Sequence, residues 1–225
     1  MRIALIGPAL PDHGGAARHT TELAYRLAAA GHNVVIESWR ASGPAASNTA
    51  ASGPAASNRA ASGPADGDPY PRTYRRLAWY RPDGWIAAGR RLRSADLVVF
   101  ALPSQAQVPS YLSVLTALSL GPDRPRTALI CHTALPAAEP GGQGLTRALL
   151  ARADTVIVHS AAQAAQARAL APEVPIVIAR MPPHLPAATP VFKDHLAERS
   201  VDLAPGPPDP EPYWSAYLHA LGVKP

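Results

Sequence analysis

The sequence contains little cysteine and no long apolar run, and both shortages narrow the classes of protein to which it can belong. Its single cysteine, Cys131, cannot form an internal disulfide and lies in an apolar run, so we expect a buried structural thiol and no zinc site. No stretch of 18 apolar residues exists, which argues against a helix that crosses a membrane. Met1 leads directly into an apolar run without a charged region or cleavage site, so we expect a cytoplasmic chain.

Several cofactor-binding and catalytic motifs are also missing. The first loop lacks the Gly-x-Gly-x-x-Gly spacing, Glu37 is the only acidic candidate for a ribose contact, and no Walker-type phosphate loop is present. A nicotinamide or flavin enzyme is therefore disfavoured, and we expect no cofactor. The pairs Cys131-His132 and His159-Ser160 lie outside any Gly-x-Ser-x-Gly turn, and adjacent strand residues point to opposite faces, which argues against a hydrolase.

The charge of the chain is positive and is carried almost entirely by arginine. The formal net charge is +5, and Lys193 and Lys224 are the only lysines. Seven arginines lie between residues 72 and 93. This concentration favours a phosphate-bearing ligand or peripheral contact with an anionic membrane, and the alternative is the solvated face of a helix. No nucleic-acid-binding module accompanies the arginines, so we expect no nucleic-acid partner.

Residues 1–38 have the pattern of one β-loop-α-β unit. Apolar runs at 3–6 and 34–36 flank a helical segment that ends at Gly31. Because both runs are apolar on both faces and a helix connects them, the two strands should pair in parallel. The spacing predicts a buried helix face made of Ala16, Thr20, Leu23 and Leu27. The opposite face is predicted to carry His19, Glu22 and Arg26.

A glycine pair, Gly14-Gly15, stands between the first strand and this helix. Glycine lets a ligand approach the backbone closely, and the amino end of a helix attracts anions such as phosphate. The pair is therefore a candidate anion cradle, and a simple tight turn is the alternative.

A repeat and an aromatic segment follow the second strand. Residues 41–65 repeat a ten-residue unit of small and polar residues, which bury too little surface to offset the cost of ordering, so we expect a flexible insertion. Trp79, Tyr80 and Trp85 come next, and their rings could stack on a sugar or pack against the sheet. A helix is predicted to begin at Pro82.

Strand and helix patterns then alternate. Further strands are predicted at 97–102, 127–131, 155–158 and 176–179. Helices are predicted at about 108–120, in a short segment ending near residue 153, and at 161–170 with Ser160 as its cap. The pattern predicts one α/β domain with a doubly wound, mostly parallel Rossmann-like sheet of about six strands. A proline-rich tail at 187–225 should end in a helix at about 212–221 that docks on the sheet.

Five segments, taken in order, resemble the amino-terminal half of a family 4, GT-B-type glycosyltransferase. They are residues 1–38 with Gly14-Gly15, 79–85 (WYRPDGW), 129–132 (LICH), 153–160 (ADTVIVHS) and 182–186 (PPHLP). The resemblance covers residues 1–186 apart from the repeat. It implies a Rossmann-like domain that receives the acceptor and faces, across a cleft, a second domain that holds a nucleotide sugar.

The resemblance also implies roles for individual residues. Gly14 and Gly15 correspond to the loop that approaches the donor diphosphate. His132 corresponds to a histidine that faces the donor sugar, where it would hydrogen-bond a hydroxyl or stabilise developing charge; the alternative is a structural histidine at a strand end. Candidates on the acceptor side are His13, His19, Trp79, Arg81 and Trp85. A nucleotide sugar as co-substrate and a glycan, lipid or small-molecule acceptor are implied, with no metal ion.

One part of the resemblance is missing from the sequence. The donor half of such enzymes supplies an arginine, a lysine and two glutamates at a fixed spacing, and this chain has neither the glutamate pair nor the length after Pro186 for that domain. We therefore expect an incomplete enzyme, inactive alone, whose donor half is truncated or comes from a second chain. The alternative is a non-catalytic Rossmann-like binding or scaffold subunit that partners another transferase.

Overall fold

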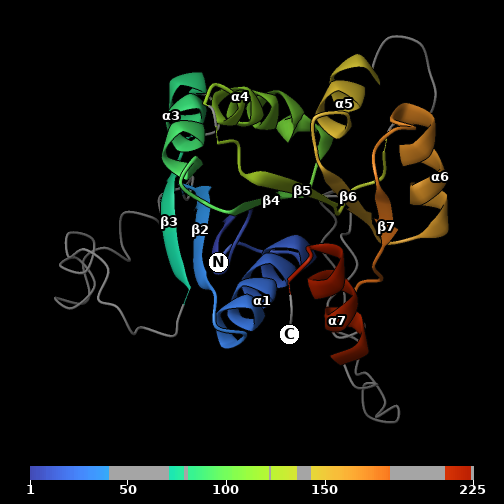
Figure 1. Ribbon diagram of the computed structural model, residues 1–225, viewed down its shortest axis with the longest axis horizontal. Helices are drawn as coiled ribbons and strands as arrows, with labels where there is room; N and C mark the ends of the chain where they lie inside the picture. Colours follow the sequence, from blue (N-terminus) through green and yellow to red (C-terminus); the bar gives the residue numbers. More distant parts are fainter. Residues whose placement is uncertain (41–70, 79–80, 122, 136–142, 183–210, 224–225) are drawn as a thin grey trace, which may run out of the picture.

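The apolar runs form the strands of one seven-stranded sheet in the computed structural model, which describes residues 1–40, 71–78, 81–121, 123–135, 143–182 and 211–223. The strands are β1 Arg2–Ile6, β2 Asn33–Trp39, β3 Arg72–Leu77, β4 Leu97–Leu102, β5 Arg126–Cys131, β6 Thr155–Val158 and β7 Ile176–Ile178. Their order in the sheet is β3-β2-β1-β4-β5-β6-β7, and every neighbouring pair is parallel (Figure 1). The predicted α/β sheet is confirmed.

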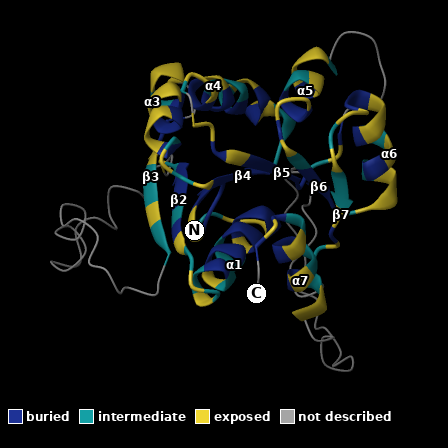
Figure 2. Cartoon of the chain, viewed as in Figure 1, coloured by how far each residue is buried: buried dark blue, intermediate teal, exposed yellow. Residues whose placement is uncertain are grey.

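The helices cover both faces of this sheet. They are α1 Gly15–Ala29, α3 Pro82–Leu92, α4 Val108–Ser119, α5 Gln143–Leu150, α6 Ala161–Leu170 and α7 Glu211–Ala220, with a short 3-10 helix, η2, at Gln105–Gln107. Helices α3 to α6 pack on one face, and α1 and α7 pack on the other (Figure 1). Because side chains alternate along a strand, β4 sends Val98 and Phe100 to the first layer and Leu97 and Val99 to the second. The central strands are therefore buried on both faces (Figure 2).

Strand β3 is a strand that the sequence pattern did not indicate. The alternative considered for the arginine-rich segment 72–93 was the solvated face of a helix, but residues 72–77 form an edge strand that pairs with β2. An edge strand has one neighbour, so its other side tolerates charged residues. Only Leu77 of β3 is fully buried. The strand therefore lacks the apolar alternation by which the others were predicted.

Helix α1 corrects the prediction for His19. The glycines at its ends have positive φ angles, 109° at Gly14 and 82° at Gly31, and its apolar face is buried as expected. His19, predicted on the opposite and polar face, is instead 0% exposed. The reason is α7, whose Trp214 and Tyr217 rings lie 5.1 Å and 4.6 Å from the His19 ring, so that a second stripe of α1 is covered.

The predicted docking of the terminal helix on the sheet layer is confirmed. Trp214 and Tyr217 of α7 are at most 1% exposed and share a core cluster with Leu23 of α1. Arg26 of α1 forms an ion pair with Glu211 and lies over the Trp214 ring, 5.1 Å from its centroid. Burial and a cation–π contact thus join two helices from opposite ends of the chain.

Two local predictions also hold. The Ser160 hydroxyl caps α6 by accepting a hydrogen bond from the Gln163 amide at 3.2 Å, and Cys131 is a buried free thiol. The repeat at 41–65 lies outside the described residues. Within the described residues, no helix combines the length and apolar character needed to span a bilayer.

Replacing Trp214 with alanine tests the docking of α7. We expect W214A to lower the free energy of unfolding by about 3–5 kcal/mol, because removal of a buried indole leaves a cavity. H219A, at an exposed position of the same helix, should change it by less than about 0.5 kcal/mol. Urea unfolding followed by circular dichroism measures both, and a loss below about 1 kcal/mol for W214A would contradict a docked α7.

Candidate functional site

Three histidines gather where β5 and β6 end. His132 directly follows β5, and His159 directly follows β6. The register of these strands pairs Ile130 with Ile157, so each histidine stands two residues beyond the same pair. Their ring centroids are 5.0 Å apart. His19 of α1 completes the cluster, with its ring centroid 4.8 Å from that of His132 and 6.1 Å from that of His159.

A chain of polar contacts ties two of these histidines to the end of β7 and to α7. Nε2 of His159 lies 3.2 Å from Nδ1 of His132. Nδ1 of His159 lies 3.0 Å from the carbonyl oxygen of Ala179, the residue after β7. The Tyr217 hydroxyl donates to the same carbonyl at 3.0 Å, and its oxygen is 2.9 Å from Nδ1 of His159. Three neighbouring strands and the terminal helix therefore build one polar cluster.

Burial keeps these imidazoles uncharged at neutral pH. Burial, with a smaller effect from His159, lowers the pKa of His19 to about 3. Burial, together with the neighbouring His19 and His159, also holds the pKa of His132 well below its ordinary value. The pKa of His159 is lowered by burial as well, although the hydrogen bond to the Ala179 carbonyl acts in the opposite direction.

Several nitrogens of this cluster have no hydrogen-bond partner among the described residues. They are both ring nitrogens of His19 and Nε2 of His132, which are buried. Buried polar atoms in proteins are nearly always hydrogen-bonded, so unpartnered nitrogens of this kind are unusual. His132 as a whole is 6% exposed, but its Nε2 atom is itself buried.

The glycine pair lies beside the topological switch point of the sheet, where connections from neighbouring strands lead to helices on opposite faces. Strand β1 stands between β2 and β4, and the connections that follow β1 and β4 lead to helices on opposite faces, α1 and α4. In open α/β sheets, ligands bind in the crevice that this divergence creates. Gly14 is exposed with φ 109°, an angle that other residues rarely adopt, and the amino end of α1 has no side-chain cap. The pair thus forms a turn and leaves helix amides uncapped by any side chain.

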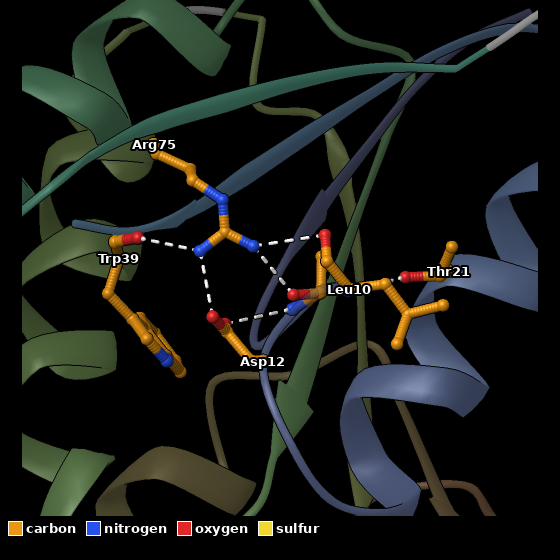
Figure 3. Close-up of polar contacts among 6 residues, drawn as sticks. Leu10, Asp12, Thr21, Trp39 and Arg75 are labelled. Carbon is orange, nitrogen blue, oxygen red and sulfur yellow. Dashed lines mark hydrogen bonds and ion pairs between the residues drawn. The ribbon is translucent and has the colours of Figure 1, made fainter. Parts of the chain in front are cut away.

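Arg75 of β3 holds the β1–α1 loop in place (Figure 3). Its Nη1 atom donates to Oδ1 of Asp12 at 2.8 Å and to the Trp39 carbonyl at 3.4 Å. Its Nη2 atom donates to the carbonyls of Ala9 and Leu10 at 2.8 Å and 3.0 Å. The side chains of Arg75 and Asp12 are 25% and 23% exposed, so the ion pair is partly shielded from water. One guanidinium therefore fixes the loop that leads to Gly14.

The other candidate residues from the sequence lie in different settings. His13 is exposed in the loop beside Gly14. Arg81 is exposed at the start of α3 and forms an ion pair with Asp83 at 2.8 Å. Trp79 lies outside the described residues. The structure therefore places His13 with the glycine loop and His19 with His132, and it leaves Arg81 at the amino end of α3.

Trp85 is a core residue. It is 1% exposed, and its Nε1 atom donates to the Ala78 carbonyl at 3.1 Å. Its ring lies 5.8 Å from the Trp39 ring and 6.0 Å from the Tyr111 ring. Of the two alternatives considered for this aromatic residue, packing is the one observed, because no face of the ring is open to a sugar.

Three residues of the site were not among the sequence candidates. His159 follows β6 as His132 follows β5, and parallel neighbours end at the same edge of a sheet, so this position carried a usable signal. Tyr217 and Arg75 carried none, because the terminal helix and an edge strand bring them to the site from distant parts of the chain.

Two further features limit the chemistry of the site. Burial raises the pKa of the Cys131 thiol to about 12, so this neighbour of His132 stays protonated and unreactive. In the part of the chain that the structure describes, no group of three or more His, Cys, Asp or Glu side chains is placed to hold a metal ion.

A hollow of about 250 Å³ lies away from these residues, by the start of β5. Its lining includes Arg124 and Arg152, which contact Asp154 and the Thr116 hydroxyl. The histidine cluster lies at the opposite edge of the sheet, where β5 and β6 end.

Comparison with known proteins gives one family and one group of structures. Residues 13–180 match the family model described as Glycosyltransferase Family 4. The chain is also similar to solved structures of an alpha-glucosyltransferase, one in complex with UDP and one in complex with UDP and a 13-mer DNA containing a central A:G mismatch. Sequence identity is 13% and 17%, with TM-scores of 0.44 and 0.43.

These structural matches cover most of this chain but less than half of the alpha-glucosyltransferase chains. They cover 89% and 79% of this chain, and 42% and 40% of the alpha-glucosyltransferase chains. The chain thus spans about two fifths of the length of those proteins. None of the curated proteins compared with the chain matches it in sequence.

Stability should fall as the pH drops below the pKa of an unfolded histidine, about 6.5. His19 and His132 have lower pKa values in the folded protein, so below that pH the unfolded chain binds protons that the folded chain does not. Their contribution is present above pH 6.5 and is lost below it. Between pH 6.5 and 5.5 we expect each to reduce the free energy of unfolding by about 1 kcal/mol, measured by urea unfolding at a series of pH values.

Two variants control this measurement. H19L removes one of the buried groups and should make the pH dependence shallower, whereas H219Q alters an exposed histidine and should leave it unchanged. A free energy of unfolding that is constant over this range would contradict the burial of neutral histidines.

Replacing Arg75 with methionine tests the support of the loop. R75M removes the ion-pair partner of Asp12 and a hydrogen-bond donor of the Ala9 and Leu10 carbonyls, so we expect a loss of about 2 kcal/mol in the free energy of unfolding and faster amide exchange at residues 9–14. Arg76 is the matched control, because its guanidinium lies over the Tyr74 ring. R76M should cost less than about 0.5 kcal/mol. Unchanged exchange in R75M would show that the loop does not depend on the arginine.

Proposed function

This chain belongs to glycosyltransferase family 4, and from that premise we propose that it forms the acceptor-side half of an enzyme that transfers a sugar from a nucleotide sugar. The family match spans residues 13–180 of 225 and includes the glycine pair and His132. One observation carries the proposal: the loop after β1 and the histidine after β5 stand at the same edge of the sheet.

The spacing of the strands suits a sugar diphosphate. Strands β1, β4 and β5 are consecutive in the sheet, so the carboxyl ends of β1 and β5, which lead to the glycine loop and to His132, are separated by two strand spacings, roughly 10 Å. Phosphate groups near Gly14 would meet the amino end of α1, where amides and the helix dipole favour negative charge. A sugar attached to that diphosphate would then extend along the edge toward His132.

His132 would act as a neutral hydrogen-bonding group. Its lowered pKa makes the imidazole a weak base, so the proton of the acceptor is not expected to go to this residue. A hydrogen bond to a hydroxyl of the sugar would fix the orientation of the donor in a water-poor site. This role requires burial, and the position of His132 between β5, His19 and His159 supplies it.

We extend the proposal to the second domain, the acceptor contact and the place of the reaction. Because the chain spans about two fifths of the length of the similar structures, we propose that a second Rossmann-like unit, in further sequence or in a partner chain, binds the nucleoside. The exposed His13 is our candidate for contact with a glycan, lipid or small-molecule acceptor. We propose a cytoplasmic reaction with no metal ion.

Binding of a diphosphate by the full chain tests this function. In amide NMR spectra we expect UDP to shift residues 12–16, and a UDP-sugar to shift the residues around His132 as well; GDP and ADP and their sugars test the choice of nucleotide. G14A should weaken the binding that the loop reports by about fivefold or more, because alanine is strained at φ 109° by about 1 kcal/mol or more.

The matched control is another glycine near the start of a helix. Gly84, in the first turn of α3, has no positive φ and has space for a methyl group, so G84A should bind as the native chain does. No shift at the loop with any nucleotide would contradict the donor-binding proposal. Co-purification with a complete transferase in the absence of such binding would instead support a scaffold subunit.

A further inference from the structure

The contacts of the Ala179 carbonyl indicate which ring nitrogen of His159 carries the proton. A carbonyl oxygen only accepts hydrogen bonds, and here it has Nδ1 of His159 and the Tyr217 hydroxyl oxygen each at 3.0 Å. If Nδ1 of His159 and the Tyr217 hydroxyl both donate to this carbonyl, each of the two contacts is a hydrogen bond. If the hydroxyl donated to Nδ1 instead, at 2.9 Å, the carbonyl would face two lone pairs at hydrogen-bonding distance. The proton of His159 therefore sits on Nδ1.

The same reasoning extends to His132. A neutral imidazole carries one N–H, and the lowered pKa of His159 keeps its ring neutral, so its Nε2 atom is an acceptor. Nδ1 of His132 lies 3.2 Å from that atom and must donate to it. The single proton of His132 is then used, and its Nε2 atom is left with a lone pair. That atom is buried, with no partner among the described residues.

We propose that His159, oriented by the Ala179 carbonyl, is a positioning residue that holds His132 as its Nδ1-protonated tautomer, so that Nε2 accepts a hydrogen bond from a hydroxyl of the bound sugar. The inference rests on the proposed function and deepens it, because it names the atom of His132 and the kind of ligand group that meet. The opposite tautomer would present an N–H and select an acceptor.

The arrangement also gives α7 a part in the site. Tyr217 reaches the Ala179 carbonyl only because Trp214 and Tyr217 are packed against α1 and β6. His19 fills the space between them, with its ring 4.8 Å from His132 and 4.6 Å from Tyr217. The terminal helix thus covers the histidine cluster and supplies a second donor to the carbonyl that orients His159.

Nitrogen-15 NMR of the histidine side chains in the full chain tests this proposal without any ligand. Two- and three-bond proton–nitrogen correlations distinguish a protonated from an unprotonated ring nitrogen. We expect His132 to be protonated on Nδ1 and bare on Nε2. A native chain with the proton of His132 on Nε2 overturns the proposal, whatever the variants do.

Variants test the route by which the tautomer is set. In H159F, His132 loses its acceptor, and we expect its proton to move to Nε2. Y217F should leave the proton on Nδ1, because His159 still donates to Ala179, and Y213F, on the same helix, is the control. A His132 that stays Nδ1-protonated in a folded H159F would overturn the role of His159.

Binding separates this inference from the proposed function. In H159F we expect the Kd for the UDP-sugar to rise about tenfold, the loss of one hydrogen bond, while the Kd for UDP stays unchanged. Equal weakening of both would indicate a structural role for His159 and contradict the proposal. Failure of the native chain to bind either ligand would contradict the proposed function. It would not affect the tautomer of His132, which the NMR measurement without ligand tests independently.

Discussion

The packing of α7 against α1 and the end of β6 is the interaction on which the candidate site depends. Two large aromatic rings, Trp214 and Tyr217, enter the core cluster that α1 shares with the sheet. Burial of this much apolar surface is worth several kcal/mol, enough to offset the cost of holding polar groups in fixed positions. It closes the space around His19 and sets the Tyr217 hydroxyl against the Ala179 carbonyl. Apolar burial therefore produces the low pKa values and the hydrogen-bond directions of the histidine cluster.

The other end of the site depends on charge. Arg75 satisfies the Asp12 carboxylate and several carbonyls of a loop that has little apolar surface of its own. A lysine would offer a single point of contact, whereas the planar guanidinium reaches several acceptors at once. The loop can therefore keep the exposed Gly14 at the amino end of α1. This support is consistent with the proposed role of the loop in binding a diphosphate, because amides fixed in advance lower the cost of binding an anion.

The sequence by itself determined six of the seven strands, most of the helices and one residue of the histidine cluster as a catalytic candidate. Long apolar runs predict strands buried on both faces, and the helical patterns between them predict parallel pairing, because these signals are local. The strand pattern placed His132 at the carboxyl end of a strand, and the family resemblance supplied its candidate role. The docking of the terminal helix was also predictable, because an apolar stripe of aromatic residues requires a surface to cover.

The tertiary structure alone decided which side chains meet. It buried His19, which the periodicity of α1 placed on a polar face, because periodicity describes one helix and not the second helix that covers it. It made a strand of residues 72–77, because an edge position relaxes the need for apolar alternation. It joined Tyr217 to His159, and through it to His132, because hydrogen bonds between distant segments depend on angles and distances that only the packed fold sets.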